Sequence, residues 1–209
     1  YQFDNVQVFF PKYVNNPLFW YYGRSLWVNL EARAVMSLIE RENLHFDLIH
    51  AHFTWPSGAV AVALKQKYSI PVVITEHTSS TFTKAIETQD KIFTDTWSKA
   101  DKIIRVKQGD VSAFSRVNIP LQNVIPIPNG YDSKKFHPTD TQRCRETLHL
   151  PLDKKLILNV GNLYGEVKGH KYLIEAISHV VTKRKDILCL IIGAGKVRTA
   201  LERQIRSLG

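Results

Sequence analysis

The sequence contains little cysteine and has no long hydrophobic run. Only two of its 209 residues are cysteines, Cys144 and Cys189, which is too few for a disulfide framework. No apolar run approaches the ~20 residues that a membrane-spanning helix needs. Residues 1–4 lead directly into a strand-like segment and show no signal-peptide architecture. We therefore expect a cytoplasmic protein.

The chain also lacks a dense basic cluster, although its charge is strongly positive. It carries 28 Lys and Arg against 19 Asp and Glu, a formal net charge of +9. Nucleic-acid binding favours clustered basic residues with stacking aromatics. Here the basic residues are dispersed, and we expect the one exception, residues 183–185, to be a solvated turn. Anionic lipid headgroups or phosphorylated substrates explain this charge better, and we expect no nucleic-acid partner.

Strand and helix patterns alternate along the first two thirds of the chain. A helix from about 24 to 41 is expected, and another begins near Pro56, where Val60, Leu64 and Tyr68 recur at helical spacing. Near-continuous apolar runs between helices predict a parallel sheet covered on both faces. The expected strands are residues 6–10, 47–52, 70–75, 102–106 and 123–127.

The same pattern starts again after Pro138. Two strands and three helices are expected there, at residues 140–149, 156–160, 173–181, 187–192 and 197–208. A usual sheet has about five or six strands, so this second unit looks cut short. We place the units at residues 1–138 and 139–209, joined near 131–140.

Residues 156–192 have features of a phosphate-binding unit. The first apolar strand ends at Gly161. A helix follows Lys168 and Gly169, and the second strand is followed by Gly193 and Gly195. Backbone N–H groups and a helix N-terminus favour an anion, and a lysine adds a mobile positive charge. On these residues alone, an ordinary turn with a solvated lysine is the alternative.

Polar side chains gather where the expected strands end. In open α/β sheets the ligands lie at the carboxyl ends of the strands. His77 directly follows a strand and precedes hydroxyl side chains, so it is a candidate functional residue. We expect His52 to be a structural hydrogen-bonding histidine. No ligand spacing supports a metal site at His50, His52 and His77, and we expect none.

Three common motifs are absent. Gly193-x-Gly195 lacks the third glycine of the dinucleotide fingerprint, because Arg198 stands there. The sequence has no Walker A motif, and Ser79 and Ser80 do not lie in a G-x-S-x-G elbow. These absences argue against a dinucleotide-binding unit, a P-loop NTPase and a serine hydrolase.

Several segments together resemble glycosyltransferase family 4. Residues 127–138 look like the family's P-N-G-[VY]-D-x-x-x-F-x-P hinge. Residues 160–163 and 168–176 are similar to its V-G-R-L…K-G…L-[IL]-x-A signature, and residues 46–52 and 75–78 match its first-domain strands. The resemblance covers the chain from about residue 45 to the end.

This resemblance implies an α/β protein of GT-B type. Residues 1–138 would be an acceptor-side Rossmann-like domain, a doubly wound parallel sheet missing its first strand. Residues 139–209 would begin a second Rossmann-like domain that binds the nucleotide sugar and faces the first across a cleft. The implied reaction is retaining, hexosyltransferase-type transfer in cell-envelope glycan synthesis, from a UDP-, GDP- or ADP-sugar to a polysaccharide, lipid-linked or other glycan acceptor. A non-catalytic sugar-nucleotide-binding module is the alternative.

The resemblance also implies roles for individual residues. His77 matches a histidine near the donor sugar, and Lys168 matches the diphosphate-binding lysine, so both are expected to be catalytic. The remaining expected nucleotide contacts are Gly161, Asn162, Gly169, Gly193 and Gly195. No metal or other cofactor is implied, because protein cations and a helix N-terminus neutralise the leaving diphosphate.

The chain departs from the family pattern at three places. Asn162 stands where arginine is frequent, and its amide brings no charge to the diphosphate. The family's E-x7-E motif would lie beyond Gly209, and its glycine-rich first loop would precede Tyr1. We therefore expect a fragment that is catalytically inactive by itself.

An aromatic cluster at residues 19–22, with Trp27 nearby, accompanies the positive charge. Amphipathic rings and basic residues favour a headgroup interface, which would place the protein at the inner face of the cell membrane. The alternative is that these rings fill the first-domain core or the acceptor cleft.

Overall fold

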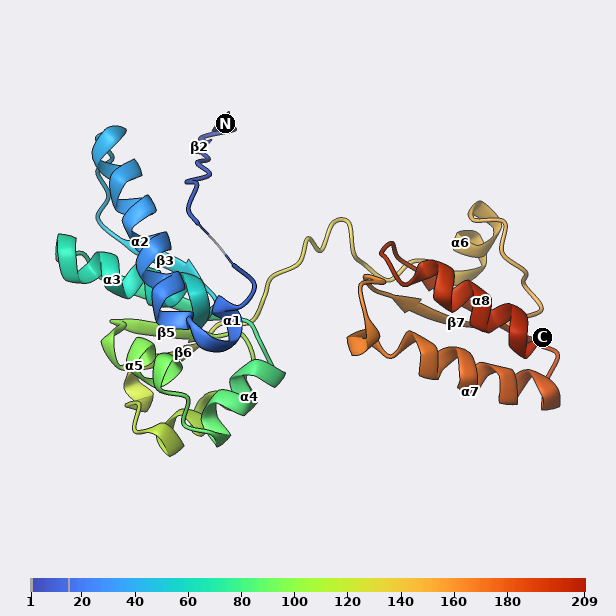
Figure 1. Cartoon of the computed structure of the whole chain (residues 1–209). Helices are drawn as coiled ribbons and strands as arrows, with labels where there is room; N and C mark the ends of the chain where they lie inside the picture. The colour runs from blue at the N-terminus through green and yellow to red at the C-terminus, as the bar shows by residue number, and fades with distance from the viewer. Residues whose placement is uncertain (1, 15) are drawn as a thin grey trace. The chain divides into compact units, whose positions relative to one another are not determined.

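The computed structural model describes residues 2–14 and 16–209 of the chain. They form two compact units, Tyr1–Tyr131 and Asp132–Gly209 (Figure 1). Each unit combines helices with a parallel sheet, as the alternating pattern of the sequence predicts.

The sheet of the first unit has four parallel strands, in the order β3-β4-β5-β6. Because all four strands run the same way, their carboxyl ends share one edge of the sheet. Strand β3 is Ile49–His52, β4 is Val72–Glu76, β5 is Lys102–Arg105 and β6 is Val124–Pro126.

Helical segments connect these strands (Figure 1). Between β3 and β4 lie η1 (Thr54–Gly58) and α3 (Ala59–Tyr68); between β4 and β5 lie α4 (Ser80–Glu87) and α5 (Lys91–Lys99); between β5 and β6 lie η2 (Gln108–Val117) and η3 (Leu121–Asn123). The predicted helix over residues 24–41 is confirmed as α2, Arg24–Arg41, which packs along α3.

One face of this sheet has a fully buried centre. Val72, Ile74 and Ile103 have no exposed surface, and they belong to one core cluster with Trp97 and Phe114. The rings of Trp97 and Phe114 meet edge to face with centroids 5.0 Å apart. Burying such aromatic and β-branched side chains is the main stabilising contribution to this unit.

The expected strand over residues 6–10 is wrong in extent and in place. Only Val6–Gln7 form a strand, β2, which pairs antiparallel with β1, Gln2–Phe3, outside the four-stranded sheet. Val6 and Phe10 are largely exposed, and Pro11 has no N–H to donate to a ladder. The strand therefore ends at Gln7, and Phe9 and Phe10 beyond it are exposed. The short helix α1, Phe19–Tyr22, follows.

The second unit has two parallel strands, β7 (Lys155–Val160) and β8 (Ile187–Ile192). Its helical segments are α6 (Thr141–Thr147), η4 (Glu166–Lys168), α7 (His170–Lys183) and α8 (Arg198–Leu208). Helices α7 and α8 pack against each other. An apolar cavity of about 370 Å³ lies beside them, lined by Ile174, Cys189 and Ile205 among others.

In the part of the chain that the structure describes, no helix combines the length and the apolar character needed to cross a membrane.

Candidate functional site

Three histidines gather at the carboxyl edge of the first sheet. His50 and His52 lie on β3, and His77 directly follows β4. The Nδ1 atom of His52 is 2.8 Å from the Nε2 atom of His77, and the Nε2 atom of His50 is 2.7 Å from the hydroxyl of Thr75. The structure therefore confirms His52 as a hydrogen-bonding histidine, and its partner is the candidate residue His77.

The rings of this cluster are stacked closely enough to affect one another. His50 and His52 have ring centroids 4.6 Å apart, and His52 and His77 lie 5.1 Å apart with planes inclined by 16°. The pKa of His50 is lowered, first because burial disfavours the charged imidazolium and then because His52 and His77 repel it. A neutral His50 is thus the favoured form near pH 7.

The three rings do not form a metal-ligand set. Among residues 2–14 and 16–209, no group of three or more histidine, cysteine, aspartate or glutamate side chains is placed to hold a metal ion.

A buried carboxylate connects the segments that follow β3 and β4. Glu76 is 0% exposed. Its Oε2 accepts from the backbone N–H and the hydroxyl of Thr54 at 3.1 and 2.5 Å, and its Oε1 accepts from the same two groups of Thr78, both at 2.6 Å. Four donors offset the desolvation of the carboxylate. Glu76 thereby fixes the backbone directly after His77 and joins it to the start of η1.

A buried arginine holds the end of β4 from the next strand. Arg105, also fully buried, donates to the backbone carbonyl of Glu76 at 2.7 Å and to Asp110 Oδ2 at 2.5 Å. Its guanidinium lies 4.3 Å from the ring centroid of Phe82. The sequence showed a charged residue in each of two apolar strands, but their partners could not be read from it.

Phe53 has a backbone conformation that is unusual for a residue with a side chain. Its φ is 71° and its ψ is 143°. Its N–H donates to the Thr75 carbonyl at 2.8 Å, and its carbonyl accepts from Gly58 N–H at 3.0 Å. Such a conformation costs about 1–3 kcal/mol and persists where the surroundings impose it. The ring is 45% exposed and lies 5.2 Å from that of His77.

In the second unit, backbone pairing continues beyond β7 and β8. Gly161 N–H donates to the Ile192 carbonyl at 2.9 Å, and Leu163 N–H donates to the Ala194 carbonyl at 2.8 Å. A Cβ on Gly193 would lie 2.0 Å from the Gly161 carbonyl oxygen. Only glycine permits so close an approach of two backbones.

Gly195 meets the same restriction with the neighbouring loop. Its φ is +150°, and a Cβ there would lie 2.3 Å from the carbonyl oxygen of Leu163. The two glycine positions therefore allow the loops after β7 and β8 to lie against each other, and the backbone hydrogen bonds hold them there.

Lys168 is brought to this same edge of the second sheet. It ends η4 and is exposed, and its Cγ lies 3.7 Å from the point where a Cβ on Gly161 would stand. Gly169, with φ of 70°, then leads into α7, whose N-terminus no described side chain caps. Uncapped N–H groups beside a lysine form a suitable environment for an anion.

His170, the first residue of α7, is a site feature that the sequence reasoning missed. It is 2% exposed, and its Nε2 lies 3.4 Å from the backbone oxygen of Asn162. Its Cε1 is 3.5 Å from the position of a Cβ on Gly161. A histidine directly after Lys-Gly was the available signal.

All the nucleotide contacts expected from the sequence lie at this edge of the second unit. Gly161, Asn162, Gly193 and Gly195 come from the two paired loops, and Lys168 and Gly169 from the segment before α7. His77, by contrast, belongs to the first unit.

Comparisons with known proteins agree with this division. The model of Glycosyltransferase Family 4 matches residues 3–135, and that of Glycosyl transferases group 1 matches residues 140–209. TuaC of Bacillus subtilis (strain 168), a glycosyltransferase named for teichuronic acid biosynthesis, is 29% identical over 184 residues. That match covers 83% of this chain and 44% of TuaC.

Two further proteins match most of this chain over about half of their own length. A D-inositol 3-phosphate glycosyltransferase of Acidothermus cellulolyticus is 24% identical over 193 residues, covering 80% of this chain and 40% of that protein. The crystal structure of Anabaena HepE in complex with UDP and glucose matches with a TM-score of 0.66 at 20% identity, over 94% of this chain and 52% of HepE. The chain thus spans about half the length of these relatives.

The resemblance inferred from the sequence motifs is therefore confirmed. The first family model covers residues 3–135, more than half of the chain, and the structural neighbours share its α/β architecture. The chain belongs to glycosyltransferase family 4 and has the fold of the GT-B glycosyltransferases.

Proposed function

We propose that the whole protein, of which this chain spans a part, is a retaining hexosyltransferase. It moves a sugar from a nucleotide-diphosphate sugar onto a glycan or lipid-linked acceptor in cell-envelope glycan synthesis. Family membership supports transfer in general. The observation that carries the donor assignment is the glycine-paired edge of β7 and β8, with Lys168 and the uncapped N-terminus of α7 beside it.

The donor is a UDP-, GDP- or ADP-sugar in this proposal. HepE has been crystallised with UDP and with UDP-glucose, so UDP-sugars are the first donors to test. As the bond between the sugar and the diphosphate of the donor breaks, negative charge develops on the leaving diphosphate. Lys168 and the first N–H groups of α7 would stabilise that charge, as preorganised donors do in other transfer enzymes.

His77 is the proposed catalytic residue of the first unit, placed near the donor sugar. The hydrogen bonds of Glu76 to Thr54 and Thr78 support this role, because they fix the loops around His77. Glu76 is a positioning residue in this scheme. Transfer is proposed to need no metal or other cofactor, and unchanged rates in the presence of EDTA would support that part.

The test of transfer uses the full-length protein and measures nucleoside diphosphate release from each sugar nucleotide.

The role of Lys168 is tested by binding. Lys168→Ala should weaken UDP binding by about 1.5–3 kcal/mol, the size of a charge-assisted hydrogen bond, and leave uridine binding unchanged. Lys171→Ala is the matched control, because that lysine is on the same segment but is paired with Glu166 at 2.6 Å. Equal losses for UDP and uridine would contradict the role of Lys168.

A non-catalytic sugar-nucleotide-binding module is the second candidate, favoured by the neutral Asn162 at a position where arginine is frequent. The two candidates differ in one result. A binding module retains its sugar nucleotide intact, whereas the transferase releases a nucleoside diphosphate. If the full-length protein turns over no UDP-, GDP- or ADP-sugar, the enzyme proposal fails.

The 209-residue chain by itself is proposed to be inactive in transfer. It spans 44% of TuaC, and the E-x7-E pair implied by the resemblance does not occur within it. Transfer depends on holding donor and acceptor in position, so the missing contacts should abolish it. Measurable transfer by the chain alone would refute this.

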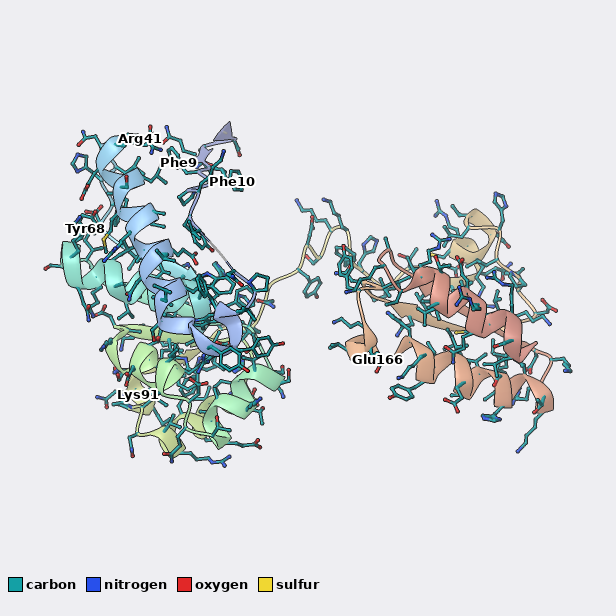
Figure 2. The ribbon with its side chains drawn as sticks, viewed as in Figure 1. Phe9, Phe10, Arg41, Tyr68, Lys91 and Glu166 are labelled. Carbon is teal, nitrogen blue, oxygen red and sulfur yellow. The ribbon has the colours of Figure 1, made fainter. Side chains whose placement is uncertain are left out.

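We also propose that the protein works in the cytoplasm, at the inner face of the cell membrane. Tyr21 and Tyr22 are 74% and 90% exposed and do not fill the core, and Leu18 is exposed beside them. Figure 2 shows Phe9 and Phe10 near Arg41, and with Lys12 these side chains line one groove along α2. Exposed rings among basic side chains favour an anionic headgroup layer.

Flotation with phosphatidylcholine vesicles, with and without phosphatidylglycerol, tests this location. Binding should require the anionic lipid, fall with salt, and decrease in the Leu18→Ser/Tyr22→Ser double variant. Tyr131→Ser is the control, because Tyr131 is also largely exposed, at 76%, but lies outside the N-terminal segment. No salt-sensitive binding would remove the proposal.

A further inference from the structure

A cavity of about 550 Å³ opens in the first unit beside the loop that carries His77. We call it the α4 pocket, because five of its lining residues lie on or just before α4. Its lining comprises Tyr21, Arg24, Trp55, Thr78, Ser80, Thr81, Lys84, Ala85, Asp90 and Phe93. Its volume is within the range of small-molecule sites in proteins.

The inner wall of the α4 pocket is aromatic and rigid. Trp55 is 9% exposed and Phe93 5% exposed, and both belong to the core cluster of the unit. Trp55 is further fixed by the ring of Trp27, whose centroid is 5.1 Å away. Tyr21 lies at the rim and is largely exposed. Flat aromatic surfaces of this kind suit the C–H faces of a sugar ring.

Hydroxyl groups supply the polar part of the lining. Thr78 donates its hydroxyl proton to Glu76 Oε1 at 2.6 Å, which leaves the hydroxyl oxygen free to accept a hydrogen bond. Ser80 and Thr81 are exposed at the start of α4 and can both donate and accept. Aromatic faces combined with hydroxyls match a polyhydroxylated ring better than a purely apolar ligand.

The charges of the α4 pocket leave one cation without a partner. Arg24 is paired with Asp90 at 2.8 Å, and Asp90 Oδ1 also accepts from Ile92 N–H at 3.1 Å to cap α5. Lys84 has no ion-pair or hydrogen-bond partner for its ammonium among the described residues. The pocket therefore has a net charge of about +1 and favours a ligand with one anionic group.

We infer that the α4 pocket binds a sugar that carries a single anionic group, a carboxylate or a phosphate, held by Lys84. This inference rests on the proposed function, in which such a sugar is the acceptor. The position agrees, because Thr78 of the pocket is the residue directly after His77. A carboxylate and a phosphate both offer anionic oxygens that Lys84 can bind, so experiment must distinguish them.

Titration of the 209-residue chain with three probes tests the inference, using glucose, glucuronate and glucose 6-phosphate followed by NMR. We expect the anionic sugars to bind about tenfold more tightly than glucose, as one charge-assisted hydrogen bond allows. Lys84→Met should abolish this preference, and Lys84→Glu should reverse it. Lys84 is exposed, so both variants should fold, which circular dichroism will verify.

Lys91→Met is the matched control, because Lys91, labelled in Figure 2, is an exposed lysine at the start of α5 that does not line the pocket. It should leave all three affinities unchanged. Preference for glucuronate alone or glucose 6-phosphate alone supports the inference and identifies the anion.

Equal affinities for the three sugars, or no binding of any, overturn the inference. Inorganic phosphate that binds as tightly as glucose 6-phosphate shows an ion site without sugar recognition and also overturns it. None of these probes is a nucleotide, so this failure is separate from failure of the donor assay on the full-length protein.

Discussion

The Nδ1 atom of His52 and the Nε2 atom of His77 lie 2.8 Å apart, so one proton lies between the two rings. One nitrogen donates and the other accepts, which means that the tautomers of His52 and His77 are coupled. His52 lies on β3 and His77 follows β4. The parallel register of these strands, with His52 opposite Thr75, brings the rings together.

Acidification should destabilise the first unit through His50. Its pKa lies below the ordinary value of 6.5 because of burial and of repulsion by His52 and His77. The unfolded chain therefore takes up this proton before the folded chain does, and stability falls as the pH decreases from about 6.5 to the lower folded pKa. Urea midpoints measured by tryptophan fluorescence at several pH values give the slope.

The variant His50→Asn should show a smaller loss of stability across that interval. The carboxyl pKa values of Asp101 and Asp110 are lowered from 3.8. These two groups therefore titrate at a lower pH than His50 and do not contribute to the loss of stability in that interval. All four tryptophans lie in the first unit, and fluorescence therefore reports that unit. An unchanged slope in the variant would show that another group is responsible.

Removing the charge of Asp110 should strongly destabilise the first unit. Asp110→Asn leaves the fully buried guanidinium of Arg105 without its carboxylate, and breaking such a pair costs about 3 kcal/mol. Glu42→Gln is the control, because its partner Arg41 is exposed (Figure 2) and such pairs contribute about 0–1 kcal/mol. Similar urea midpoints for the two variants would refute a structural role for the buried pair.

Much of the fold follows from local signals, because apolar runs and helical spacing need no knowledge of distant residues. They predicted α2 and the four parallel strands of the first unit to within a few residues. The wrong strand at residues 6–10 shows the limit of this reasoning. An apolar run remains a strand only if pairing and burial hold it, and Phe9 and Phe10 lie outside β2 and are 37% and 73% exposed.

The site was predictable in part for the same reason. Glycines beside Lys168 are a local pattern, and they gather at one edge as expected. The environment of His77 was not predictable, because Glu76 binds Thr54, 22 residues away, and Arg105 reaches back to β4. The left-handed φ of Phe53 leaves no trace in the sequence, because glycine is the usual signal for it.

The strain at Phe53 predicts that glycine is a more stable substitution than alanine there, the reverse of the order expected within a helix. At φ of 71° alanine retains the unfavourable conformation, whereas glycine adopts it readily. Phe53→Gly should therefore be more stable than Phe53→Ala by about 1 kcal/mol. At Thr83, an exposed position within α4, alanine should be the more stable substitution by about 1 kcal/mol. The same order at both positions would show that Phe53 is unstrained.

The close approach of Gly193 and Gly161 predicts that a methyl group added at Gly193 weakens nucleotide binding. In Gly193→Ala the new Cβ would stand 2.0 Å from the Gly161 carbonyl oxygen, so the loops after β7 and β8 must separate. Backbone cannot yield as a flexible side chain does. We expect UDP binding to the full-length protein, measured by calorimetric titration, to fall at least about tenfold, a loss of ~1.4 kcal/mol.

Gly165→Ala is the control for this prediction. Gly165 precedes η4 in the same unit, its φ of 178° suits any residue, and nothing lies within 4 Å of a Cβ built there. It should bind UDP as the unmodified protein does. Gly193→Ala should also lower the thermal midpoint of the second unit, because the hydrogen bond from Gly161 N–H to the Ile192 carbonyl is next to the clash. If Gly193→Ala binds UDP normally, the paired loops do not form the nucleotide site.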